Sequence, residues 1–325
     1  MNLIVHDPSR KPVAMLSDYQ LDLQYGKGDC NFVLSAPDIT LDAQWRIHVD
    51  GMPYGGIVTR PCPASTADGD RISYEGVTVQ GVMADHVIEP PRGKSHLSLS
   101  GDANEIISQV FELADVGPDY LVADTLPSGL EVASYSFNRY VDVWTGLRMM
   151  LASVGGRLEV ECKDGGHVVR AVKRTAYGGV ESERAYFELK LDKLPYNHII
   201  ALGKGEGAAR EVVHWYASLG GIISKNQSLF GELKRTYVYQ LNSEEGSALA
   251  AKAKVKLEEL QTVSEADLSL PPGVSLDVGD RVLLSNAHYN LAAEAEVTDV
   301  VVKASLGIED VQYKFGSPDY PKDEE

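Results

Sequence analysis

A glycine-rich turn is the closest match in the sequence to a nucleotide-binding motif. In "HIIALGKGEGAAREVV", Gly203, Gly205 and Ala208 match the G-x-G-x-x-A variant of the dinucleotide fingerprint after an apparent strand. A dinucleotide site needs a helix N-terminus directly after this turn and an acidic residue about 20 positions further on. Residues 212–216 instead continue as a strand, and residues 223–229 contain no acid. We therefore favour a glycine-rich hairpin loop over a nucleotide site.

Histidine and cysteine are the next candidates, because they bind metals and take part in acid–base and nucleophilic catalysis. No two histidines are four residues apart and none adjoins a cysteine; the eight are His6, His48, His86, His96, His167, His198, His214 and His288. The cysteines, Cys30, Cys62 and Cys162, are far apart and odd in number, which suits neither a metal clamp nor a disulfide framework. We predict scattered histidines that are exposed or hydrogen-bonded, buried cysteines, and no metal or cofactor.

Hydrolytic chemistry would need a nucleophile motif or a pair of suitably spaced carboxylates. The sequence contains no G-x-S-x-G nucleophile elbow, but it has two acidic pairs, Glu159 with Glu161 and Glu244 with Glu245. The first pair falls on the solvent face of a predicted strand. The second falls in the first turn of a predicted helix, where the helix dipole favours acids. We predict no catalytic, cofactor-binding or metal-binding residue, and no enzyme activity.

The composition is that of an ordinary soluble globular protein, with 44% hydrophobic and 24% charged residues. At 325 residues the chain is long for one core, so we expect two or three domains. Its 47 acidic and 30 basic residues give a net charge of −17, which repels both nucleic-acid phosphates and anionic lipids. We expect no specific nucleic-acid binding. We also expect no membrane insertion, since the sequence shows neither a long apolar window nor a signal-like N-terminus.

Residues 1–92 are predicted to form a first β-barrel-like domain, because short runs of alternating polarity are separated by Gly, Pro and Asp. In "DRISYEGVTVQGVMADHVIEPP", two β runs at 71–74 and 77–83 are hinged at Glu75-Gly76, as a β-bulge would be. Pro90-Pro91 cannot donate to a ladder and so ends the pairing. We expect this segment to close the barrel and then direct the chain out of the sheet.

The spacing of apolar residues along the rest of the chain changes twice, from strand-like to helical and back. Residues 93–184 are predicted to form an α+β domain, with a helix capped by Asp102 and a second helix at about 141–154. Residues 185–325 return to β patterning and are predicted to form a second β-barrel-like domain with a helical excursion near 243–260. The fold class is therefore mainly β with an α+β insert, in which two small barrels that superpose on each other carry a peripheral α+β domain.

The order of these segments resembles a known family. "WRIHVDGMPYGGIVTR" and then "RISYEGVTVQGVMADHVIEPP" before a helix resemble the opening barrel of the tail-hub proteins of long-tailed bacteriophages, which include tail-tip and baseplate-hub proteins. "LDVGDRVLLSN" and "AEVTDVVVKASLGIEDVQYKFG" resemble the closing strands of that family, which is related to the hub of type VI secretion spikes. The resemblance extends in order over nearly the whole chain.

The resemblance implies a structural role without catalysis. It implies a homotrimer whose barrels form a ring with an axial channel for DNA, joining the tail tube and the distal tail protein to other tail-tip subunits. Such a protein is made in the bacterial host cytoplasm and ends in the virion, at the tail tip. Many tail-tip proteins continue into a peptidase, fibre or spike, whereas this sequence stops soon after Gly316. The strand segments 71–83 and 295–303 are our candidate subunit-contact edges.

Two other functions stay open. The 16 tyrosines and 3 tryptophans could stack on sugars, as in a carbohydrate- or receptor-binding tail module. Most of them fall inside strand patterns, where a core or interface position is the simpler explanation. A cell-wall hydrolase is the third alternative.

Overall fold

The computed structural model describes residues 2–66, 69–163, 166–177, 186–189, 196–218, 223–242, 244–260, 266–269, 274–286, 291–305 and 308–316. The predicted domain boundary at 184/185 and His288 lie outside these residues. The described chain is mainly β, as predicted, and carries four α-helices.

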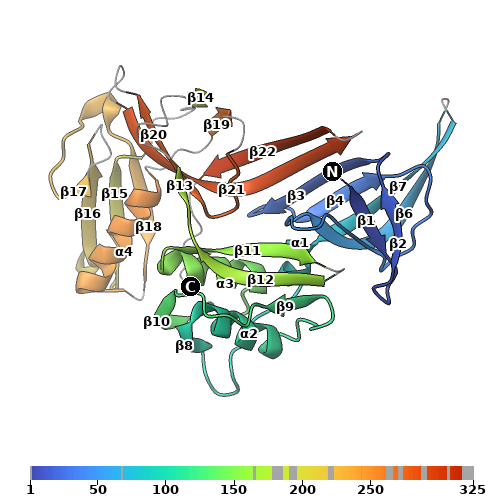
Figure 1. Cartoon of the computed structure of the whole chain (residues 1–325). Helices are drawn as coiled ribbons and strands as arrows, with labels where there is room; N and C mark the ends of the chain where they lie inside the picture. Colours follow the sequence, from blue (N-terminus) through green and yellow to red (C-terminus); the bar gives the residue numbers. More distant parts are fainter. Residues whose placement is uncertain are drawn as a thin grey trace.

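The largest sheet joins the two ends of the chain. Within the described residues it has 11 strands in the order β13-β20-β21-β3-β4-β7-β6-β5-β1-β2, with β22 beside β21. β3 pairs antiparallel with β21, so that Tyr25 lies opposite Val300, and Figure 1 shows the blue N-terminal strands beside the red β21–β22 hairpin. The strands are β1 Leu3–His6, β2 Pro12–Leu16, β3 Gln20–Gly26, β4 Asn31–Ser35, β5 Arg46–His48, β6 Gly55–Thr66, β7 Gly69–Thr78, β13 Ala176–Tyr177, β20 Arg281–Asn286, β21 Leu291–Ser305 and β22 Ile308–Gly316. The described strands form an open sheet, and the predicted closed barrels are not confirmed.

The segment predicted as two β runs is instead a strand followed by a helix. β7 runs straight through Glu75-Gly76 to Thr78, and the helix α1, Val79–Ala84, follows at once. The Thr78 side chain caps α1 by accepting a hydrogen bond from the Gly81 backbone N–H at 3.2 Å. Val79 and Met83, four residues apart, are both fully buried, which is a helical spacing. The prediction of a strand over 77–83 was therefore wrong from residue 79 onward.

The predicted bulge lies on the neighbouring strand. The register between β6 and β7 shifts between Val58 and Arg60, opposite Gly76 and Glu75. Gly76 has a different role, because a Cβ built there would lie 2.3 Å from the Phe32 ring and 2.3 Å from the Ile57 carbonyl oxygen. The glycine therefore provides room for Phe32 to lie over the sheet.

An α+β unit follows α1. It contains β8 Ser98–Asp102, α2 Ala103–Leu113, β9 Leu121–Ala123, β10 Glu131–Ser136, α3 Val143–Ser153, β11 Gly156–Lys163 and β12 Gly166–Lys173. β11, β12 and β9 form one small sheet, and β8 pairs with β10 in another. The Trp144 side chain on α3 donates a hydrogen bond of 2.7 Å to the Gly26 carbonyl at the end of β3. This contact ties the unit to the main sheet.

Asp102 caps α2, as the sequence indicated, and also holds the loop before β10. Its carboxylate accepts hydrogen bonds from the backbone of Asn104, Ser128 and Gly129 and from the Ser128 hydroxyl. Burial acts to raise the pKa of Asp102, but these hydrogen bonds outweigh it and hold the pKa below its ordinary value.

We expect Asp102→Ala to lower the free energy of unfolding by about 2 kcal/mol, at the upper end for a helix cap, because several donors lose one acceptor together. Asp142→Ala is the matched comparison, since Asp142 caps α3 through one hydrogen bond, to Thr145 N. Its expected cost is about 1 kcal/mol. Urea unfolding followed by circular dichroism measures both. Equal costs would contradict the added role of Asp102 in the loop.

A third unit lies between the α+β unit and β20. It is a sheet in the order β17-β16-β15-β18 covered by α4, and a separate pair of strands, β14 and β19. The elements are β14 Tyr186–Leu189, β15 His198–Leu202, β16 Val212–Ala217, β17 Ile223–Ser224, β18 Thr236–Gln240, α4 Gly246–Glu259 and β19 Ala266–Ser269, with short 3-10 turns at Gly207–Ala209 and Gly231–Leu233. The helix predicted near 243–260 is confirmed, with Leu249, Ala253 and Leu257 buried against the sheet. That the two ends of the chain superpose stays a prediction.

Candidate functional site

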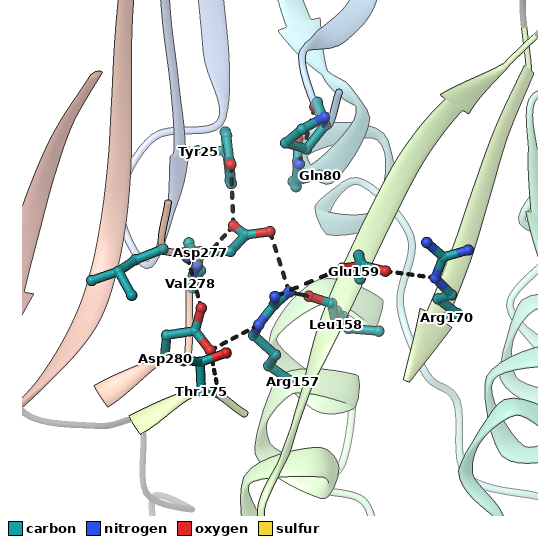
Figure 2. A network of polar contacts seen from close by, with 12 residues as sticks. Tyr25, Gln80, Arg157, Leu158, Glu159, Arg170, Thr175, Asp277, Val278 and Asp280 are labelled. Carbon is teal, nitrogen blue, oxygen red and sulfur yellow. Dashed lines mark hydrogen bonds and ion pairs between the residues drawn. The ribbon is translucent and has the colours of Figure 1, made fainter. Parts of the chain in front are cut away.

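A buried polar junction holds three distant segments together. Arg157 on β11 donates from Nε to Asp280 Oδ1 at 2.9 Å, and its Nη1 lies 3.5 Å from Asp277 Oδ2. The Tyr25 hydroxyl on β3 donates to Asp277 Oδ1 at 3.1 Å. Figure 2 shows these side chains converging from β3, β11 and the turn before β20. The junction therefore fixes the α+β unit against main-sheet segments from both ends of the chain, β3 and the turn before β20.

The two aspartates of this junction are held by the turn on which they lie. Asp280, whose side chain is 1% exposed, also accepts hydrogen bonds from the backbone N–H groups of Thr175 at 2.6 Å and Asp277 at 2.9 Å. Gly279 supplies the turn with a φ of +95°, a conformation that favours glycine. Burial raises the pKa of Asp277 to about 6, against the lowering effect of Arg157. Asp277 therefore gains its proton in mild acid, at a higher pH than an ordinary aspartate does.

A cleft of about 310 Å³ opens beside the junction, with the first acidic pair on its wall. Glu159 and Glu161 lie on β11, partly exposed, and both bond to Arg170 on β12, at 2.5 and 3.0 Å. Arg157 also lies 3.7 Å from Glu159. These carboxylates and Asp277 are thus each within ion-pair distance of an arginine. The arrangement stabilises the cleft wall, which suits a structural role for the pair.

The glycine-rich turn is a hairpin loop, as we favoured. β15 and β16 pair antiparallel on either side of it, so that Leu202 lies opposite Val212. Only a short 3-10 turn occurs within the loop, at Gly207–Ala209, and Gly205 has a φ of +107°. In the described residues no α-helix follows directly after this turn, as a dinucleotide site would need; α4 begins nearby instead, where Gly246 N donates to the Glu211 carboxylate at 3.0 Å. The second acidic pair precedes α4, and Glu244 accepts a hydrogen bond from Lys252 at 2.9 Å.

The histidines are less scattered than predicted. His6 and His48 stack with ring centroids 4.7 Å apart, and the His167 ring lies 6.4 Å from His48. His167 Nδ1 lies 2.7 Å from the sulfur of Cys162, which is buried as predicted, whereas Cys30 and Cys62 are only half-buried. His198 and His214 form a second pair, with Nε2 and Nδ1 2.9 Å apart. Sequence spacing could not reveal either group, because strand pairing brings its members together.

Neither group has the geometry of a metal centre. Within the described ranges, no set of three or more His, Cys, Asp or Glu side chains is arranged to hold a metal ion. Among the same described residues, no helix is both long and apolar enough to cross a membrane.

The strands proposed as subunit-contact edges lie inside the main sheet. β7 is paired on both sides, with β4 and β6, and β21 pairs with β3, β20 and β22. The prediction of free edges at 71–83 and 295–303 is therefore wrong. β2 ends the main sheet instead, since in the described part of the chain it pairs only with β1. On this edge Val13 and Met15 are 49% and 65% exposed.

Comparison with known proteins identifies the fold. No family model matches the sequence, and no curated protein matches it. The tail protein from Neisseria meningitidis MC58 superposes with a TM-score of 0.53 at 17% identity, covering 97% of this chain and 96% of that chain. A prophage tail protein from Listeria monocytogenes EGD-e gives 0.54 at 12% identity, with 97% and 94% covered. The 43 kDa tail protein of prophage MuSo2 from Shewanella oneidensis gives 0.54 at 12% identity, with 97% and 98% covered.

The chain therefore has a phage tail-protein fold over almost its whole length. The resemblance recognised in the sequence is confirmed at this level, which is that of the fold.

Proposed function

We propose that this protein is a structural component of a phage tail, and more specifically a hub at the tail tip. In this role three copies form a ring that joins the tail tube and the distal tail protein to the tip and leaves a channel for DNA. The observation that carries the proposal is the similarity of fold to three tail proteins over 97% of the chain. The proposal assigns no enzyme activity to the chain.

Two properties of the molecule support assembly into a ring. The free edge of β2 carries exposed apolar side chains, and an uncovered edge of this kind is a template for pairing with another chain. The net charge of −17 would let DNA pass along an acidic channel without adhering to it. A carbohydrate-binding role has less support, since aromatic residues such as Tyr74 and Trp144 are buried.

We expect three copies of the chain per tail, related by threefold symmetry. Imaging of assembled tails tests this directly, and light scattering at rising concentration shows whether the trimer forms without the tail. A closing ring needs two different surfaces on each subunit. One copy per tail, or a twofold dimer, would refute the hub proposal.

The β2 edge provides a variant for the same experiment. We expect the double substitution Val13→Lys and Met15→Lys to reduce assembly, because two charges would have to be buried against the neighbouring subunit. Val33→Lys is the matched control, since Val33 is similarly exposed but lies on β4, which is paired on both sides. Equal loss of assembly in both variants would argue against β2 as the contact.

A further inference from the structure

Three buried histidines gather where the main sheet meets the α+β unit. His6 lies on β1, His48 on β5 and His167 on β12, and we call them the histidine cluster. Their side chains are 4%, 2% and 2% exposed. The contact between the main sheet and the α+β unit therefore contains three buried imidazole side chains, a type of side chain that can gain a positive charge in mild acid.

The contact around the histidine cluster is formed by the turn between β5 and β6. Gly51 N donates to the Cys162 carbonyl at 2.9 Å, and Cys162 N donates to the Met52 carbonyl at 3.2 Å. The Cys162 thiol is 3.8 Å from the Tyr54 carbonyl and 2.7 Å from His167. Cys162 thus lies between the two parts of the molecule and touches the histidine cluster directly.

The surroundings of the histidine cluster offer little to balance added positive charge. The charged and titratable groups that face it are Asp7 and Arg10 after β1, Arg46 on β5, Asp50 after β5, Asp119 and Tyr120 before β9, and Glu161 and Cys162 on β11. Asp50 accepts from His48 at 3.1 Å, but its side chain is 65% exposed, so water screens its charge.

Arg46 is a fixed positive charge at the same place. Its guanidinium lies over the Tyr120 ring, 4.8 Å from the centroid, and Tyr120 in turn packs against His167. Among the described residues, four buried polar atoms here have no hydrogen-bond partner: His6 Nδ1, Arg46 Nε, Arg46 Nη1 and Tyr120 OH. The cluster is therefore already rich in donors before any histidine is protonated.

These surroundings oppose protonation. Burial, followed by the charges of His48 and Arg46, lowers the pKa of His167 to about 3. Burial and His48 also lower the pKa of His6 below its ordinary value. A histidine whose pKa is lowered in the closed contact stabilises that closed contact. This stabilisation is fully present above about pH 6.5, which is the ordinary pKa of histidine. That stability is lost as the pH falls toward the depressed pKa, because the opened contact binds more protons.

We propose that the histidine cluster is an acid-sensitive latch, in which protonation of His6 and His167 below about pH 6 loosens the contact of the β5–β6 turn with β11 and β12 while the secondary structure is kept. The opening exposes Cys162.

The accessibility of Cys162 tests the latch in the full-length chain. In a Cys30→Ser, Cys62→Ser background, Cys162 is the single thiol, and 4,4′-dithiodipyridine labels thiols in acid as well as at neutral pH. After correction with a model thiol, we expect labelling to accelerate by at least about ten-fold for each pH unit below 6, which is the slope for one histidine, and more steeply where His6 and His167 are protonated together. Circular dichroism should stay unchanged over the range in which labelling rises. Labelling that does not change with pH, or that rises only together with loss of secondary structure, would overturn the proposal.

Two variants and a control separate the latch from general acid unfolding. His167→Gln should flatten the pH dependence, because the most strongly depressed group is gone. Arg46→Met keeps every histidine but removes the fixed charge, so it should move the opening to lower pH even if His167→Gln fails to fold. His96→Gln is the control, since His96 is exposed and lies outside the histidine cluster. An unshifted opening in Arg46→Met, or a shift of equal size in His96→Gln, would refute the latch.

Discussion

Replacing Arg157 with methionine is expected to lower the free energy of unfolding by about 3–5 kcal/mol. The Arg157 side chain is 13% exposed and Asp280 is 1% exposed, so the substitution leaves a buried carboxylate without its cation. Asp277 loses the same partner. The cost exceeds that of a surface ion pair because the remaining charges are far from water, and urea unfolding measures it.

Two further variants check that explanation. Asp280→Asn in the Arg157→Met background should recover part of the loss, since it removes the orphaned charge while keeping one oxygen that can accept from the N–H of either Thr175 or Asp277, which bond to different oxygens of the aspartate. Arg60→Met is the control, because Arg60 pairs with Glu75 on the exposed surface. We expect no measurable change from it. If Arg60→Met cost as much as Arg157→Met, the role of burial would be refuted.

Phe32→Ala is expected to cost about 3–5 kcal/mol, the range for a large aromatic residue in a core. Phe32 is 1% exposed, and its ring lies against both Gly56 on β6 and Gly76 on β7. Gly76→Ala should cost about 1–3 kcal/mol, because the new methyl group meets the ring and the Ile57 carbonyl.

A double-mutant cycle shows whether the ring is the reason for the glycine. The cost of Gly76→Ala should be smaller in the Phe32→Ala background, although part of it persists because the Ile57 carbonyl belongs to the backbone. Gly117→Ala is the control, since a Cβ there meets nothing within 4 Å. Strictly additive costs for Phe32→Ala and Gly76→Ala would mean that the ring does not determine the residue at position 76.

Sequence reasoning succeeded where short-range interactions decide the structure. The cap of α2 could be read because Asp102 bonds to a backbone group two residues away. α4 could be read from apolar residues at helical spacing, and the β15–β16 hairpin from a loop rich in glycine. The order of these elements along the chain was also sufficient to recognise the resemblance to tail proteins. All of this information lies within a few residues of the element that it specifies.

The misassigned strand over 79–83 shows that the spacing of apolar residues in a short segment does not always distinguish a strand from a helix. Apolar residues at 77, 79 and 83 suit both a strand and a helix, and the Thr78 cap together with the burial of Val79 and Met83 decided for the helix. Likewise the sheet was predicted, but not which strands end it. The edges at 71–83 and 295–303 were wrong because pairing of β7 with β4 and β6, and of β21 with β3, depends on contacts between distant segments.

The sequence by itself thus determined α2 with its cap, α3, α4, the β15–β16 hairpin, the acidic charge and the likeness to tail proteins. Only the tertiary structure decided that β3 meets β21, that Arg157 lies between Asp277 and Asp280, and that His6, His48 and His167 share one buried contact. The physical reason is the range of the interactions. Caps and turns are specified by neighbours in the chain, whereas burial, ion pairing and strand edges depend on which distant segments the folded core brings together.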